Sequence, residues 1–141
     1  MFFLVLRFSI FGFLQANATV NEKVLKVFNE TFKEAKNIEW HQWEDHYVVN
    51  FLKDAVRHNA VYDKEGNFLS LRRYYMEDKL PISILFKLKK KYKDKHIYGV
   101  TEVMDNDGVY YHITLEDKFS WWIVKVTFHE FIEITEKLRK Q

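Results

Sequence analysis

The spacing of apolar residues repeats along the chain, and it constrains the fold more than any other feature of the sequence. Two segments carry apolar residues at the period of one helical face. These residues are Val24, Leu25, Phe28 and Phe32 in the first segment and Ile84, Leu85, Leu88 and Tyr92 in the second. Each segment is followed by alternating, strand-like stretches that Asp- and Gly-containing turns separate. The pattern predicts two repeats, residues 19–76 and 77–141.

Each repeat is predicted to contain one helix and four strands, which gives an α+β fold. The first helix is expected to start at a capping box, with Thr19 as N-cap and Glu22 three residues on, and to reach about Lys36. The second is expected to start at Leu80-Pro81 and to reach about Lys95, because Pro suits the first turn of a helix. Strands are predicted at 38–41, 46–52, 56–62, 68–75, 97–104, 109–115, 120–128 and 131–135.

One hairpin breaks the correspondence between the repeats. The turn Asp63–Gly66 of the first repeat aligns with Thr127-Phe128-His129 in the second, where no Gly is available for positive φ. We therefore expect the last hairpin to turn differently, or the last strand to be shorter than residues 131–135.

The N-terminus has the pattern of a signal peptide. Residues 1–14 are apolar except for Arg7 and Ser9, and Gln15-Ala16-Asn17-Ala18 follows with the small residues that a signal peptidase requires. The apolar run is too short to span a membrane comfortably. The sequence predicts a signal peptide over residues 1–18, an exported protein and no stable membrane span after cleavage. A buried strand and a retained anchor are the alternatives.

Few residues suggest chemistry. There is no Cys, so thiol catalysis and Cys-bound zinc are excluded, and a net charge of +2 gives no nucleic-acid footprint. His41, His46 and His58 are a conceivable three-His site, although their spacing matches no tight ligand motif. The run Asp105–Gly108 lacks the Gly position of a calcium loop. No metal, cofactor or catalytic residue is predicted.

The surplus of aromatic residues is the best functional indication. The chain has 13 Phe, 8 Tyr and 4 Trp. Adjacent residues in a strand point to opposite faces, so Trp121 and Trp122 cannot share one face, and Trp43 lies opposite Trp40. Exposed aromatic patches usually mark interaction sites. The predicted protein-binding residues are Trp43, Trp121, Trp122, Tyr110 and His112.

The chain resembles the β-lactamase-inhibitor-like, PepSY-like proteins secreted by Bacteroidetes-type bacteria. The resemblance covers the whole chain after residue 18 and rests on several stretches. These are Phe28-x-x-x-Phe32-Lys-x-Ala35-x-Asn37-Ile38-x-Trp40, Tyr47-Val48-Val49-Asn50-Phe51, Ala60 to Gly66, Leu80-Pro81, and Tyr92 leading into Ile97 and Val100. It implies two copies of a helix packed on a four-stranded antiparallel sheet and an exported location. PepSY-type domains are suggested to bind or restrain peptidases, but no inhibitory motif is matched.

These observations predict an exported, non-enzymatic module that binds or inhibits a peptidase or another periplasmic protein through its sheet face. One alternative is a small enzymatic or ligand-binding cone that uses His41, His58 or His112 with a nearby carboxylate. Another is a structural subunit of a cell-surface assembly. The sequence does not define the oligomeric state.

Overall fold

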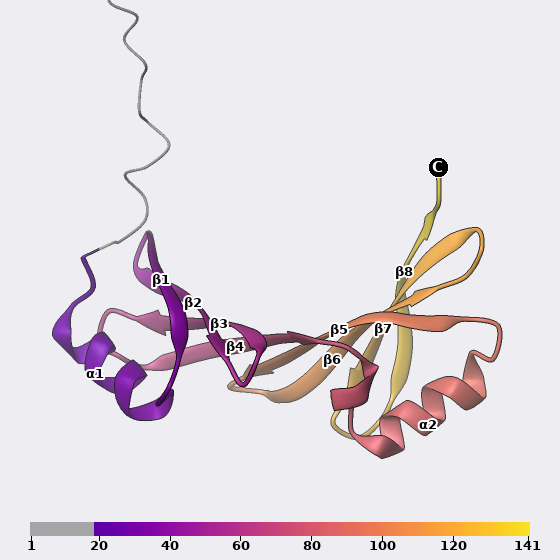
Figure 1. The fold of residues 1–141 in the computed structure, drawn as a ribbon, viewed down its shortest axis with the longest axis horizontal. Coiled ribbons are helices and arrows are strands. Elements are labelled where there is room, and N and C mark those ends of the chain that lie inside the picture. The colour runs from indigo at the N-terminus through magenta and orange to yellow at the C-terminus, as the bar shows by residue number, and fades with distance from the viewer. Residues whose placement is uncertain (1–18) are drawn as a thin grey trace, which may run out of the picture.

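The computed structural model describes residues 19–141, which form one antiparallel sheet with two helices (Figure 1). The predicted signal peptide, residues 1–18, lies outside the described residues. The elements are α1 (Glu22–Thr31), β1 (Lys36–Trp43), β2 (His46–Lys53), β3 (Val56–Asp63), β4 (Phe68–Tyr75), a 3-10 turn (Glu77–Lys79), α2 (Ile82–Lys91), β5 (His96–Asp105), β6 (Gly108–Glu116), β7 (Ser120–Thr127) and β8 (Ile132–Arg139).

The eight strands form a single sheet in chain order, so the prediction of a tandem pair of four-stranded units is wrong. Strands β4 and β5 pair directly, from Ser70 opposite Asp105 to Tyr75 opposite Val100. Pairing satisfies backbone groups that two separate sheets would leave open at these edges. An alternating pattern looks the same in an edge strand and in an interior strand, which is why the sequence did not reveal the join.

Both helices cover the same face of this sheet. In β4, Leu71 packs in the cluster under α1 and Tyr75 packs in the cluster under α2. Residues 71 and 75 share one strand face because side chains alternate with a period of two. Figure 1 shows α1 and α2 on one side of the sheet, near its two ends. The opposite side carries no helix, and we call it the helix-free face.

The helices are shorter than predicted, and α1 has a different cap. The Asn21 side chain, not Thr19, accepts a hydrogen bond from the Val24 N–H at 3.0 Å. Helix α1 ends at Thr31 with Phe32 as C-cap, and Glu34 in the following turn adopts a left-handed conformation with φ 67°.

The last hairpin does turn differently from its counterpart. Glu130 supplies the positive φ, 59°, that Gly66 supplies in the first half. The Glu130 N–H donates to the Thr127 carbonyl at 2.8 Å, and the Thr127 N–H donates to the Phe131 carbonyl at 3.1 Å. Strand β8 runs from Ile132 to Arg139, so it is longer, not shorter, than the predicted 131–135.

The cluster under α1 is built around Phe28, which is 1% exposed. Its ring meets Trp40 and Phe51 edge-on, with centroids 5.1 Å apart in each case, and Phe32 at 5.6 Å. Such contacts add to the free energy gained by burying the ring.

Phe28→Ala should lower the free energy of unfolding by about 3–5 kcal/mol, since it leaves a cavity in this cluster. Leu88→Ala, under α2, should shift the same single transition by about 2–5 kcal/mol because one sheet joins the two clusters. Phe86→Ala is the control, since that side chain is 67% exposed. Urea unfolding followed by circular dichroism measures all three. Two separate transitions would contradict a single cooperative sheet.

Candidate functional site

One row of side chains crosses the helix-free face from β3 to β7. Arg57 lies opposite Tyr74, which lies opposite Thr101, and Thr101 faces His112, which faces Lys125. The Arg57 guanidinium carbon lies 5.3 Å from the centre of the Tyr74 ring. Neighbouring strands thus place cationic and aromatic side chains next to one another on a rigid sheet.

A hollow of about 560 Å³ adjoins this row. Its lining includes Arg57, Tyr74, Tyr98, Thr101 and Thr114. The hollow has room partly because Gly99 lies beneath it, at the register shift between β5 and β6. A Cβ atom at this glycine would meet no atom within 4 Å. The missing side chain therefore leaves space that a bound group can fill.

An aromatic pair borders the hollow. Tyr98 meets the Trp121 ring edge-on, with centroids 4.7 Å apart. The Lys140 ammonium lies 4.5 Å from the Trp121 ring and 2.8 Å from a Glu116 oxygen. These contacts hold Trp121 in a defined orientation, which limits the entropy lost when a partner contacts it.

A second row gives the centre of the face its positive charge. Arg72 lies opposite Val103, which lies opposite Tyr110. The Lys125 ammonium lies 4.5 Å from the Tyr110 ring. Burial lowers the pKa of His112, and the charges of Lys125 and Arg72 lower it further. His112 is therefore a neutral, aromatic part of this surface at pH 7.

Four of the five predicted binding residues lie on the helix-free face, and the sheet separates them. Tyr110 and His112 are neighbours on β6, with ring centroids 5.4 Å apart. Trp121 lies by the hollow. Trp43 ends β1 in the distant first hairpin and is 70% exposed. The structure thus places Trp121 and His112 near the hollow and the row of side chains beside it, whereas Trp43 lies apart from both.

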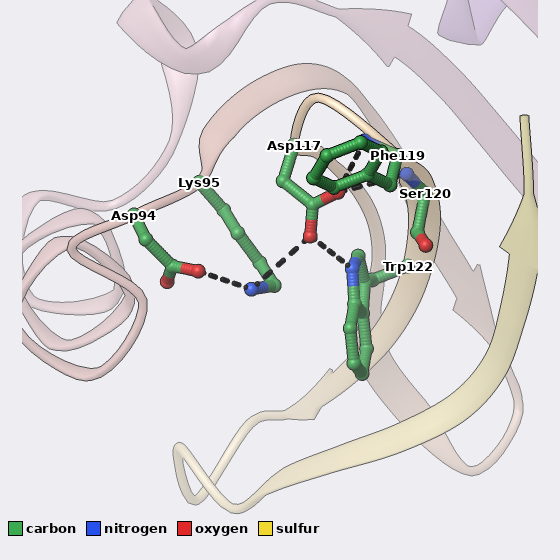
Figure 2. A network of polar contacts seen from close by, with 6 residues as sticks. All are labelled: Asp94, Lys95, Asp117, Phe119, Ser120 and Trp122. Carbon is green, nitrogen blue, oxygen red and sulfur yellow. Dashed lines mark hydrogen bonds and ion pairs between the residues drawn. The ribbon is translucent and has the colours of Figure 1, made fainter.

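Trp122 lies on the other face, where it packs against the cluster under α2. Figure 2 shows that its Nε1–H donates to Asp117 at 2.9 Å, while the Lys95 ammonium lies 3.4 Å from the same carboxylate oxygen. The backbone N–H groups of Phe119 and Ser120 donate to the other oxygen at 2.9 and 2.8 Å. Asp117 therefore joins Trp122 of β7 to Lys95 in the loop between α2 and β5.

Sequence reasoning missed Arg57, Tyr74 and Tyr98, which line the hollow. A usable signal was present, since Tyr74 and Tyr98 adjoin the buried residues Tyr75 and Ile97. Strand alternation places such neighbours on the outer face. What the pattern could not show is that β3, β4 and β5 would lie side by side.

A second cavity, of about 360 Å³, lies on the helix side between the end of α1 and the central strands, and His58, Arg73 and Glu102 line it. Arg73 Nη2 lies 2.7 Å from each Glu102 carboxylate oxygen, and the Tyr75 hydroxyl donates to one of them at 2.5 Å. Burial, reinforced by this hydrogen bond, raises the pKa of Tyr75.

The enzymatic alternative needs a histidine paired with a carboxylate, and in this cavity His58 makes no hydrogen bond to Asp54 or Glu102. Glu102 is already saturated by Arg73 and Tyr75. His58 Nδ1 lies 2.8 Å from the Val56 carbonyl oxygen, and burial lowers the pKa of its ring. Both groups have structural partners, so the geometry favours a packing role over acid–base chemistry.

The conceivable three-His site is not assembled. His41 and His46 lie on the helix-free face, whereas His58 lies on the helix side, because their strand positions differ in parity. Within residues 19–141, no group of three His, Asp or Glu side chains is placed to hold a metal ion.

Asp117→Asn should make stability less sensitive to acid. Hydrogen bonds from Phe119 and Trp122 lower the pKa of Asp117 to about 2, from an ordinary 3.8. A carboxyl whose pKa is lowered by folding stabilises fully above its ordinary pKa, and this stability is lost as the pH falls through about 2. Urea midpoints measured from pH 5 to pH 2 should fall less in the variant.

The control for Asp117 is Trp122→Phe, which keeps a ring but removes the indole donor. It should move the acid-dependent loss to higher pH, since one hydrogen bond to the carboxylate disappears. An unchanged pH profile in Asp117→Asn would show that this carboxylate does not stabilise the fold.

Arg73→Met should lower the free energy of unfolding by about 2 kcal/mol, because the Glu102 side chain, 8% exposed, loses its cation. The figure is below that of a fully buried pair, since Arg73 is 41% exposed. Adding Glu102→Leu should restore most of the loss. Strictly additive effects in this double-mutant cycle would rule out the coupling.

The fold matches solved structures from Bacteroides over most of the chain. A BLIP-like protein from Bacteroides fragilis is 13% identical, with a TM-score of 0.69, and the match covers 87% of this chain and 88% of that one. A DUF2874 family protein from Bacteroides ovatus is 15% identical, with a TM-score of 0.70 and coverage of 87% and 89%. A protein from Bacteroides eggerthii, described provisionally as periplasmic, is 13% identical, with a TM-score of 0.68 and coverage of 86% and 90%.

Sequence comparison adds nothing to this likeness, since no protein-family model and no curated protein sequence matches the chain. Among the described residues, no helix is long and apolar enough to cross a membrane. At 13–15% identity the structural match speaks for the fold alone. The chain therefore has the fold of the BLIP-like and DUF2874 structures, which confirms at the level of the fold the resemblance predicted from its sequence.

Proposed function

We propose that this protein is an exported binding module that holds a segment of another protein against its helix-free face. The observation that carries the proposal is the 560 Å³ hollow over Gly99, with Tyr74 in its lining and the Tyr98–Trp121 pair beside it. Aromatic side chains next to a hollow are typical of binding hot spots. Because these side chains lie on interior strands of a sheet, they lose little conformational freedom when a partner binds.

The charges on this face define the chemistry of the partner. Between β3 and β7 its cations are Arg57, Arg72 and Lys125, which lie in the two central rows. Within these strands its carboxylates lie at strand ends, and they are Asp63, Asp105 and Glu116. Asp78 and Lys79 of the 3-10 turn also line the hollow, and Glu133 of β8 lies opposite Lys125. A central positive strip favours a partner segment that carries carboxylates, since complementary charge speeds encounter and fixes register.

Two observations support export. Residues 1–18 have the signal-peptide pattern, and a structural neighbour is described provisionally as periplasmic. The BLIP-like neighbour agrees with an inhibitor-like, non-enzymatic role, and a peptidase is one candidate partner.

A photoreactive residue at Tyr98 in the full chain, expressed in the native host, should cross-link the partner. With that partner purified, Trp121→Ala should weaken binding at least about 30-fold, the loss typical of a hot spot of about 2 kcal/mol. Gly99→Leu should weaken it as much, because the new side chain occupies the hollow without backbone strain. Isothermal titration measures each dissociation constant.

Phe86→Ala is the control, since Phe86 is an exposed aromatic residue that lies on the helix side. It should leave the dissociation constant unchanged. The proposal fails if cross-linking is the same in Gly99→Leu, or if Trp121→Ala binds the captured protein as tightly as the original chain. High salt should weaken binding, since the central cations contribute to it.

A further inference from the structure

A separate surface on the helix side exposes four large apolar side chains. Two are on the first turns of α2 and two are in the β7–β8 turn. Their exposed fractions are 62% for Ile82, 67% for Phe86, 75% for Phe128 and 68% for Phe131. Exposure of several large apolar side chains in one region usually marks an interaction site.

Polar contacts hold these two elements together. Glu130 of the turn forms an ion pair with Lys87 of α2. The Ser83 side chain also lies beside this carboxylate, and both contacts lower the pKa of Glu130. Ser83 and Lys87 are the chain neighbours of Ile82 and Phe86. The turn and the helix therefore form one continuous surface, which we call the α2 patch.

The same helix continues into a cluster of lysines. Its last turn carries Lys89, Lys90 and Lys91, Lys93 follows directly, and its first turn has no acidic residue. Lys89 pairs with Glu77, but Lys90 and Lys93 form no ion pair within residues 19–141. Ile82, Phe86 and Lys90 follow one helical stripe at intervals of four residues. The exposed side of α2 is thus apolar at its start and basic at its end.

We propose that the α2 patch docks on the surface of an anionic phospholipid membrane. The exposed phenylalanines enter the boundary between headgroups and acyl chains, and the lysines bind lipid phosphates. A surface helix with exposed aromatic and basic residues has the composition of interfacial helices. The apolar side chains of the patch need hydrocarbon as a partner, and its lysines need negative charge. A bilayer offers both within about 15 Å, the length of this helix.

This position is compatible with the proposed binding face. The α2 patch is on the helix side, whereas the hollow and Trp121 are on the helix-free face. A molecule that rests on a membrane through α2 therefore leaves its binding face open to the aqueous side. The two proposals depend on different residues, and either can fail without the other.

The test measures how deeply one labelled residue enters the membrane. Binding of the full chain to vesicles is a weaker test, because the apolar residues 1–14 can by themselves bring the chain to any vesicle. The chain has no cysteine, so Phe128→Cys offers one site for an environment-sensitive fluorophore. With vesicles of phosphatidylglycerol and phosphatidylethanolamine, we expect a blue shift and quenching by lipids that carry a quencher. Phosphatidylcholine vesicles should give neither.

Trp43→Cys, labelled in the same way, is the control, since it is 70% exposed on the opposite face and should stay in water. The double substitution Lys90→Glu with Lys93→Glu should weaken vesicle binding, as reported by the label at residue 128, at least about 25-fold. This corresponds to about fivefold per lysine. Phe131→Cys replaces Phe128→Cys if that variant does not fold. The inference is overturned if the label at the turn stays in water, if Trp43 responds equally, or if charge reversal changes nothing.

Discussion

The pairing of β4 with β5 is the interaction on which the rest of the structure depends. It turns two helix-and-strand segments into one eight-stranded sheet and fixes the helices on the same side. Arg73 and Glu102 lie directly opposite each other in this pair, and their bidentate contact spans the join. Tyr75 adds a third partner. The cavity beside them separates the clusters under α1 and α2, so the join is polar on its helix side.

The join also creates the candidate binding face. The hollow is lined from β3, β4, β5 and β6 and from the 3-10 turn after β4, and no half of the chain contains all four strands. Arg57 and Tyr74 come from the first half, and Tyr98, Thr101 and Thr114 come from the second. The repeated apolar pattern therefore accounts for the two clusters that the helices cover. The candidate binding face needs strands from both halves of the chain.

The alternation of side chains along each strand predicted which residues share a strand face. It did not predict which residues of different strands come together on the helix-free face. The opposition of Trp121 and Trp122 follows from adjacent positions in β7, and the structure places them on opposite faces. Parity alone could not say which of the two is covered by α2. Trp122 is the one on the helix side, where it packs against the cluster under α2 and its indole N–H donates to Asp117. The sequence did not indicate Tyr98 as a binding residue, because its contact with Trp121 forms only when β5, β6 and β7 lie side by side.

The sequence by itself determined the element order, the apolar face of each helix and the alternation within each strand, since these depend on residues a few positions apart. It also indicated the family resemblance that the fold bears out. The tertiary structure decided that the strands form one sheet and that Arg57, Tyr74 and Tyr98 share one hollow. Hydrogen bonding between strands is a relation between distant residues, and the period of a strand is the same whichever neighbour it has.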